Sequence, residues 1–112
     1  MKRVEAIIKP FRLDDVKDAL AELGVQGMTV TEARGLAQTP GNPMALQKAS
    51  FLYDFMPKLC VEVIVPDRLV PEVIQRIEQS ARTGHAGDGR IIVSPVLEAV
   101  RIRTGERGDE AV

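Results

Sequence analysis

The chain has little of the side-chain chemistry on which most enzymes depend. Its 112 residues include a single cysteine and a single histidine. The cysteine, Cys60, cannot form an internal disulfide, and its apolar surroundings predict a buried structural thiol in a reducing compartment. The histidine, His85, lies in a glycine-rich stretch where we expect a solvated residue. No Ser–His–carboxylate arrangement and no Cys/His set with metal-ligand spacing stands out, so we expect neither a catalytic centre nor a protein metal site.

The sequence also lacks an excess of charge and a long hydrophobic run. Fifteen Lys and Arg residues stand against 16 Asp and Glu, a net charge of −1, which argues against broad binding of nucleic acid or a membrane surface. No apolar run approaches membrane-spanning length, and the first residues do not resemble a signal peptide. We therefore expect one cytoplasmic domain over residues 1–112, and its 45% hydrophobic residues suffice for a single core.

What is present is a regular alternation of strand and helix patterns. Apolar, β-branched runs predict strands at residues 4–8, 28–33, 59–65 and 91–93. Apolar residues at helical spacing predict helices at 13–23 and 70–77. Gly24 is expected to end the first helix, and Asp67 to serve as the N-cap of the second.

This order of elements predicts an α+β, ferredoxin-like βαββαβ sandwich. In that fold, a four-stranded antiparallel sheet carries both helices on one face. The other face has no cover within the chain. Alternate residues of the third strand, Cys60, Glu62 and Ile64, are too apolar for a fully solvated surface, so we expect a homo-oligomer.

Residues 83–90 form a glycine-rich stretch, followed by two arginines at 101 and 103. Glycines in this spacing let backbone N–H groups converge on an anion. Arginine adds a permanently charged fork that suits phosphate oxygens. The pattern therefore indicates a phosphate-bearing ligand. A plain turn between helix and strand is the alternative, since the stretch matches neither the dinucleotide fingerprint nor the P-loop.

A long connection over residues 36–53 is the second unusual feature. It has few charges but carries apolar residues such as Met44, Leu46 and Phe51. Connections of this length are usually functional or disordered. One interpretation is an idle insertion. We favour the other, a mobile arm that docks on a partner through its apolar residues.

These segments resemble the PII signal-transduction proteins along the whole chain. The resemblance rests on residues 4–11, 27–32, 54–58, 83–90 and 101–106. It implies a cytoplasmic homotrimer that binds ATP, ADP or AMP, with or without Mg²⁺, in each cleft between subunits, and that holds no prosthetic group. The T-loop of the family would correspond to residues 37–53, the B-loop to 82–90 and the C-loop to 101–107.

The same resemblance assigns nucleotide contacts by position. It places Gly87, Asp88, Gly89 and Arg90 at the phosphates, and Arg101 and Arg103 reach them from the adjacent subunit. The adenine and ribose end of the site, together with the base of the T-loop, would be lined by Ile7, Thr29, Gly35, Leu36, Ala37, Gln38, Glu62 and Ile64.

A small-anion site is also implied, but the T-loop departs from the family pattern. Lys58 and Gly87, which contact 2-oxoglutarate in the family, are present, and Thr39 and Gly41 are assigned to the same site. From its position alone, Lys58 is by default an exposed cation. Thr39 replaces the glutamine that ligates Mg²⁺, and Phe51 replaces the tyrosine that many members use for uridylylation. We therefore expect weakened 2-oxoglutarate binding, with bicarbonate as an alternative anion.

The resulting expectation is a non-enzymatic, allosteric signalling protein. It would compare adenine nucleotides and regulate a partner transporter or enzyme through its T-loop, so that it would meet a membrane only through a transporter partner. The alternative within the family is a regulator of the usual nitrogen-control type that senses 2-oxoglutarate. Two alternatives from other classes are a slow ATPase and a purely structural trimer.

Overall fold

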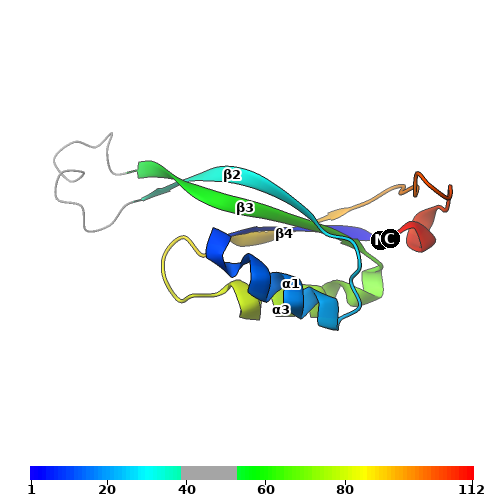
Figure 1. Cartoon of the computed structure of the whole chain (residues 1–112), viewed down its shortest axis with the longest axis horizontal. Helices are drawn as coiled ribbons and strands as arrows, with labels where there is room; N and C mark the ends of the chain where they lie inside the picture. Colours follow the sequence, from blue (N-terminus) through cyan, green and yellow to red (C-terminus); the bar gives the residue numbers. More distant parts are fainter. Residues whose placement is uncertain (39–52) are drawn as a thin grey trace.

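The computed structural model describes residues 1–38 and 53–112 and has the predicted ferredoxin-like architecture. Both helices cover one face of a single sheet (Figure 1). The main elements are β1 (Lys2–Ile8), α1 (Leu13–Glu22), β2 (Thr29–Gln38), β3 (Tyr53–Val65), α3 (Val70–Ala81) and β4 (Arg90–Pro95). Short 3-10 turns occupy Pro10–Arg12, Asp67–Leu69 and Gly108–Ala111.

The sheet has the strand order β2-β3-β1-β4, and all three pairings are antiparallel. The central strand β1 pairs with both β3 and β4, so that Ala6 lies opposite Val61 on one side and Ile91 on the other. Pro95 ends β4, an edge strand, where the missing N–H of proline is tolerated.

The core lies between the sheet and the helices, because alternate strand residues point to opposite faces. Alternate residues of β1 and β3 are buried there, together with the apolar stripes of the two helices. The buried residues are Val4, Ala6, Ile8, Val61, Val63, Val65, Val16, Leu20, Val73, Ile77 and Ala81. Gly24 follows α1 with a φ of 81° and donates to Ala21, which confirms the predicted helix end.

The other face of the sheet is open within the single chain. Cys60 lies there, half-buried between β1 and β2. The prediction of a buried thiol was therefore wrong, because the Cys60 side chain belongs to the alternate set of β3 residues that faces the open side of the sheet. Partial burial, with Glu5 and Glu62 nearby, raises the pKa of the Cys60 thiol and so disfavours the reactive thiolate.

The second and third strands along the chain, β2 and β3, are longer than the sequence predicted. β2 continues to Gln38 and β3 begins at Tyr53, and these two residues pair. The pair forms an arm that reaches beyond the helices (Figure 1). Both ends of the expected T-loop, residues 37–53, are therefore strand, and the rest of that loop lies outside the described residues.

The start of the second helix also differs from expectation. A 3-10 turn, Asp67–Leu69, leads into α3, and no side chain caps the helix. The Asp67 carboxylate lies 3.8 Å from the Lys2 ammonium instead. Among the described residues, no helix is long and apolar enough to cross a membrane.

Candidate functional site

The glycine-rich loop, residues 82–90, joins the end of α3 to the start of β4 and lies beside the base of the β2–β3 arm (Figure 1). Its position follows from the topology. β4 runs antiparallel to β1, so the loop that enters β4 meets the end of β1. Arg12, just before α1, donates to the carbonyl of Arg82 at 3.2 Å and ties the start of the loop to the helical layer.

Three glycines give this loop its shape. Gly84, Gly87 and Gly89 have φ values of 85°, 88° and 103°, a region that other residues rarely adopt. At Gly89 the space is closed as well, since a Cβ there would lie 1.6 Å from the carbonyl oxygen of Ile7. The loop therefore passes directly against the backbone of β1, and only glycine fits.

The carboxylate of Asp88 closes the loop on itself. The N–H groups of Thr83 and Gly84 both donate to its Oδ2 at 2.9 Å, and the Thr83 hydroxyl donates to Oδ1. These donors, the Thr83 hydroxyl above all, hold the pKa of Asp88 well below its usual range. Asp88 thus binds the beginning of its own loop and remains ionised at neutral pH.

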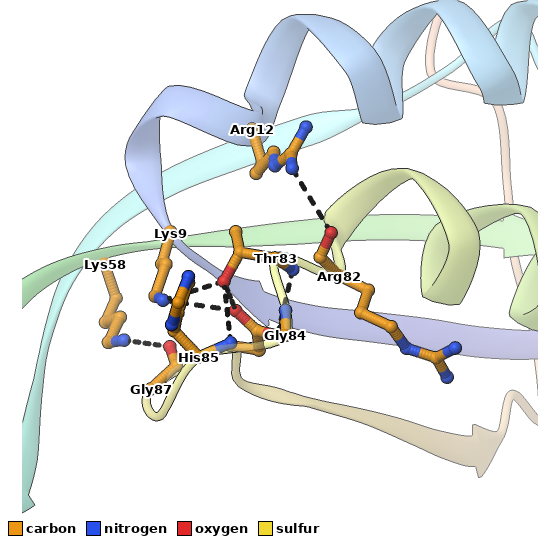
Figure 2. Close-up of polar contacts among 9 residues, drawn as sticks. Lys9, Arg12, Lys58, Arg82, Thr83, Gly84, His85 and Gly87 are labelled. Carbon is orange, nitrogen blue, oxygen red and sulfur yellow. Dashed lines mark hydrogen bonds and ion pairs between the residues drawn. The ribbon is translucent and has the colours of Figure 1, made fainter.

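Two lysines support the loop from neighbouring strands. Lys9, at the end of β1, lies 3.0 Å from the Thr83 hydroxyl and 3.2 Å from Asp88 Oδ1. Lys58, on β3, donates to the carbonyl of Gly87. Figure 2 shows both side chains pointing toward the loop. Lys58 is only 8% exposed, so its default assignment as an exposed cation was wrong, because the loop folds over it.

The loop also holds backbone donors that its own structure does not use. Within residues 1–38 and 53–112, the N–H groups of Gly87, Asp88 and Gly89 have no hydrogen-bond partner. Arg90 follows them, exposed at the start of β4. Successive free N–H groups beside a guanidinium are suited to bind phosphate or carboxylate oxygens.

The predicted arginines lie in a separate turn after β4. The N–H of Arg101 donates to the carbonyl of Glu106 at 2.9 Å, and its guanidinium lies 3.1 Å from the Glu106 carboxylate. The Thr104 hydroxyl donates to the same carboxylate oxygen at 2.7 Å. A bridge between Val100 and Arg107 closes the turn. Arg101 is thereby oriented, while Arg103 is exposed near the tip.

The predicted nucleotide contacts fall into two groups within one chain. Ile7, Asp88, Gly89 and Arg90 line a cavity of about 390 Å³ on one side. Thr29, Glu62, Ile64 and Arg101 line another, of about 880 Å³. The glycine-rich loop and the Arg101 turn lie toward opposite ends of the domain (Figure 1). One chain therefore does not bring the arginines to the loop.

Four further predicted residues lie in the last part of β2, on or next to the arm. Gly35 packs against Lys58, since a Cβ there would meet the lysine Cγ at 3.3 Å, and Leu36 is 60% exposed. Ala37 and Gln38 end β2. Thr39 and Gly41, assigned to the small-anion site, lie outside the described residues.

Sequence reasoning missed Lys9 as part of this site. The available signal was its position directly after the first strand, where an antiparallel neighbour must bring in the glycine-rich loop. In the described part of the chain, no cluster of His, Cys, Asp or Glu is suited to hold a metal ion.

The fold and the site define a small ferredoxin-like domain with a glycine-rich loop beside an extended arm. Comparison with protein families identifies it further: residues 1–106 match the family model described as "Nitrogen regulatory protein P-II". The chain belongs to this family and is a signalling regulator rather than an enzyme.

Several curated relatives align with this chain from end to end. The protein named "Nitrogen regulatory protein P-II" of Azospirillum brasilense is 52% identical, and that of Rhodospirillum rubrum is 51% identical. "Nitrogen regulatory protein P-II 1" of Escherichia coli K12 is 47% identical. Each alignment covers 112 residues and the full length of both proteins.

Proposed function

We propose that the protein is a cytoplasmic, homotrimeric regulator that binds ATP, ADP or AMP between its subunits. The observation that carries this proposal is the run of N–H groups at Gly87, Asp88 and Gly89, which have no partner among the described residues. These groups and Arg90 bind the phosphates. Mg²⁺, where it takes part, arrives with the nucleotide.

The separation of the two residue groups supports a site shared between subunits. Arg101 and Arg103 are too far from the loop of their own chain to complete its phosphate site. In a cyclic trimer, the Arg101 turn of one chain meets the loop of the next. Thr29, Glu62 and Ile64 then come from the same chain as the arginines, while Ile7, Gly35 and Leu36 come from the chain that supplies the loop.

Lys58 supports a second ligand, a small anion. Its ammonium is buried and bonded to a neutral carbonyl, and it forms no ion pair with any described residue. A buried cation without a counter-charge is costly, and a bound carboxylate or bicarbonate offsets that cost. The ligand is 2-oxoglutarate if Thr39 tolerates the Mg²⁺ geometry, and bicarbonate or another small anion if it does not.

The arm carries the output. Gly35 of β2 and Lys58 of β3 lie at the base of the arm. A ligand bound at Lys58 therefore acts directly on the two strands that lead into residues 39–52. Ligands that interact differently with two arm conformations shift the balance between them. A transporter or enzyme then recognises the favoured conformation. Phe51 excludes tyrosine uridylylation at that position, which favours a divergent branch of nitrogen control.

Isothermal titration calorimetry tests the proposal. ATP, ADP and AMP are titrated into the wild-type chain, each with and without 2-oxoglutarate or bicarbonate. Replacing Arg101 and Arg103 with alanine should weaken ATP binding by about 1.5–3 kcal/mol per lost charge-assisted contact. Arg76→Ala, which removes an exposed ion pair with Glu22, is the matched control and should leave affinity unchanged. Unchanged affinity in the Arg101 and Arg103 variants would refute the shared site.

Two further measurements separate the alternatives. Nucleotide that binds the folded chain must raise its melting temperature, and the absence of any shift would favour a purely structural trimer. Steady phosphate release from ATP would favour slow hydrolysis instead. Enhanced ATP affinity with 2-oxoglutarate, and none with bicarbonate, would place the protein with the usual nitrogen-control members.

A further inference from the structure

The proposed phosphate loop contains a carboxylate at its centre. Asp88 stands between the two glycines whose N–H groups are free, and its low pKa keeps it ionised. A bare carboxylate so close to a polyphosphate would repel it. Its presence in an anion-binding loop therefore needs a physical account.

The ammonium of Lys9 lies beside the Asp88 carboxylate and balances its charge. Its ammonium lies 3.2 Å from Asp88 Oδ1, and the exposed fractions of the two side chains are only 18% and 26%. Solvent and salt screen such a covered pair less than a surface pair. Lys9 also contacts the Thr83 hydroxyl at 3.0 Å, so one ammonium holds both ends of the turn that Asp88 closes.

We propose that Lys9 is a positioning residue for nucleotide binding: its ammonium neutralises Asp88 and fixes the 83–88 turn, so that the loop presents its N–H groups without a net negative charge. This inference rests on the proposed nucleotide site. It assigns the Asp88 side chain to the loop's own structure and not to ligand contact. The other nearby ammonium, of Lys58, is bonded to the Gly87 carbonyl and does not take over this role.

Charge neutralisation and simple bracing make different predictions. If Lys9 cancels a negative charge, then its loss must weaken ligands in proportion to their phosphate charge. The loss of affinity should be largest for ATP, smaller for ADP and smallest for AMP. Removing the carboxylate as well should restore binding, which would not occur if Lys9 were only a brace.

The experiment compares Lys9→Met, Asp88→Asn and the double variant by calorimetry at low and high salt. We expect Lys9→Met to weaken ATP binding at least tenfold, with a smaller loss at high salt and for AMP. The double variant should recover most of the lost ATP affinity. Lys17→Met removes an exposed lysine whose ammonium lies 3.7 Å from Asp14, and it should bind like the wild type.

Each outcome bears on the inference. Wild-type affinity in Lys9→Met overturns it, and so does a double variant as weak as Lys9→Met, because that result indicates bracing alone. Should Lys9→Met fail to fold, Asp88→Asn decides: the inference requires ATP affinity equal to or tighter than that of the wild type, and a tenfold loss overturns it. Each of these three negative results leaves the proposed function standing, whereas a wild-type chain that binds no nucleotide overturns both the inference and the proposed function.

Discussion

At the scale of single residues, the glycine-rich loop depends on two separate properties of glycine. Gly84 needs only an unusual backbone conformation, because nothing lies within 4 Å of the place a Cβ would take. Gly89 needs the same freedom and also the missing Cβ, since the Ile7 carbonyl occupies that space. The two positions therefore separate strain from steric exclusion within one loop.

We expect Gly89→Ala to destabilise the fold far more than Gly84→Ala. Gly84→Ala should lower the free energy of unfolding by about 1–2 kcal/mol, the cost of a left-handed conformation for alanine. Gly89→Ala must also push β4 away from β1, which should raise the loss to about 4 kcal/mol or more. Urea unfolding at equal protein concentration measures both. Equal losses would show that the contact with Ile7 relaxes freely.

The burial of the two lysines in the site could not be predicted from the sequence, for a common reason. Lys9 and Lys58 look like ordinary surface cations, although the family resemblance assigned Lys58 to the small-anion site. Their burial and partners arise only when residues 83–90 fold across the end of β1 and the middle of β3. The glycines were predictable because their constraint is local. The lysines depend on a contact between segments far apart in the chain.

At the scale of elements, burial decided what the sequence could predict. The helices and the central parts of the strands were found because their apolar residues repeat with the period of the element, and those residues form the core. The ends of β2 and β3 were missed because the arm pairs through its backbone beyond the helices. Pro57 also argued against a strand at this position, because proline is rare inside strands. In the structure, Pro57 lies within β3 and pairs with Arg34 of β2.

The buried stripe of α3 should dominate the stability that this helix contributes. Ile77 is 1% exposed and packs in the core. Ile77→Ala should lower the free energy of unfolding by about 2–5 kcal/mol, because it removes buried methyl groups and leaves a cavity. Gln75→Ala, on the exposed side of the same helix, should change it by less than about 0.5 kcal/mol. Denaturant titration followed by circular dichroism distinguishes them, and a loss below 1 kcal/mol for Ile77→Ala would contradict this core.

At the scale of the whole molecule, the open sheet face is the feature that one chain leaves unexplained. Cys60, Glu62 and Ile64 are half-buried there, and Ile92 is 43% exposed in line with Glu5. Arg3 lies 3.9 Å from Glu62 on the same face, so its charges are partly paired. A mixed surface of this kind is suited to pack against copies of itself around a symmetry axis.

We expect light scattering to give a mass of about 37 kDa, three times the 12.3 kDa of the chain. Ile92→Asp should shift this mass toward 12.3 kDa, because each subunit would bury an unpaired carboxylate at a cost of several kcal/mol. Gln79→Asp adds the same charge on the exposed side of α3 and should leave the trimer intact. If the nucleotide site is shared between two chains, as proposed, Ile92→Asp should also lose ATP binding. A monomeric Ile92→Asp that still binds ATP with wild-type affinity would show that one chain holds a complete site.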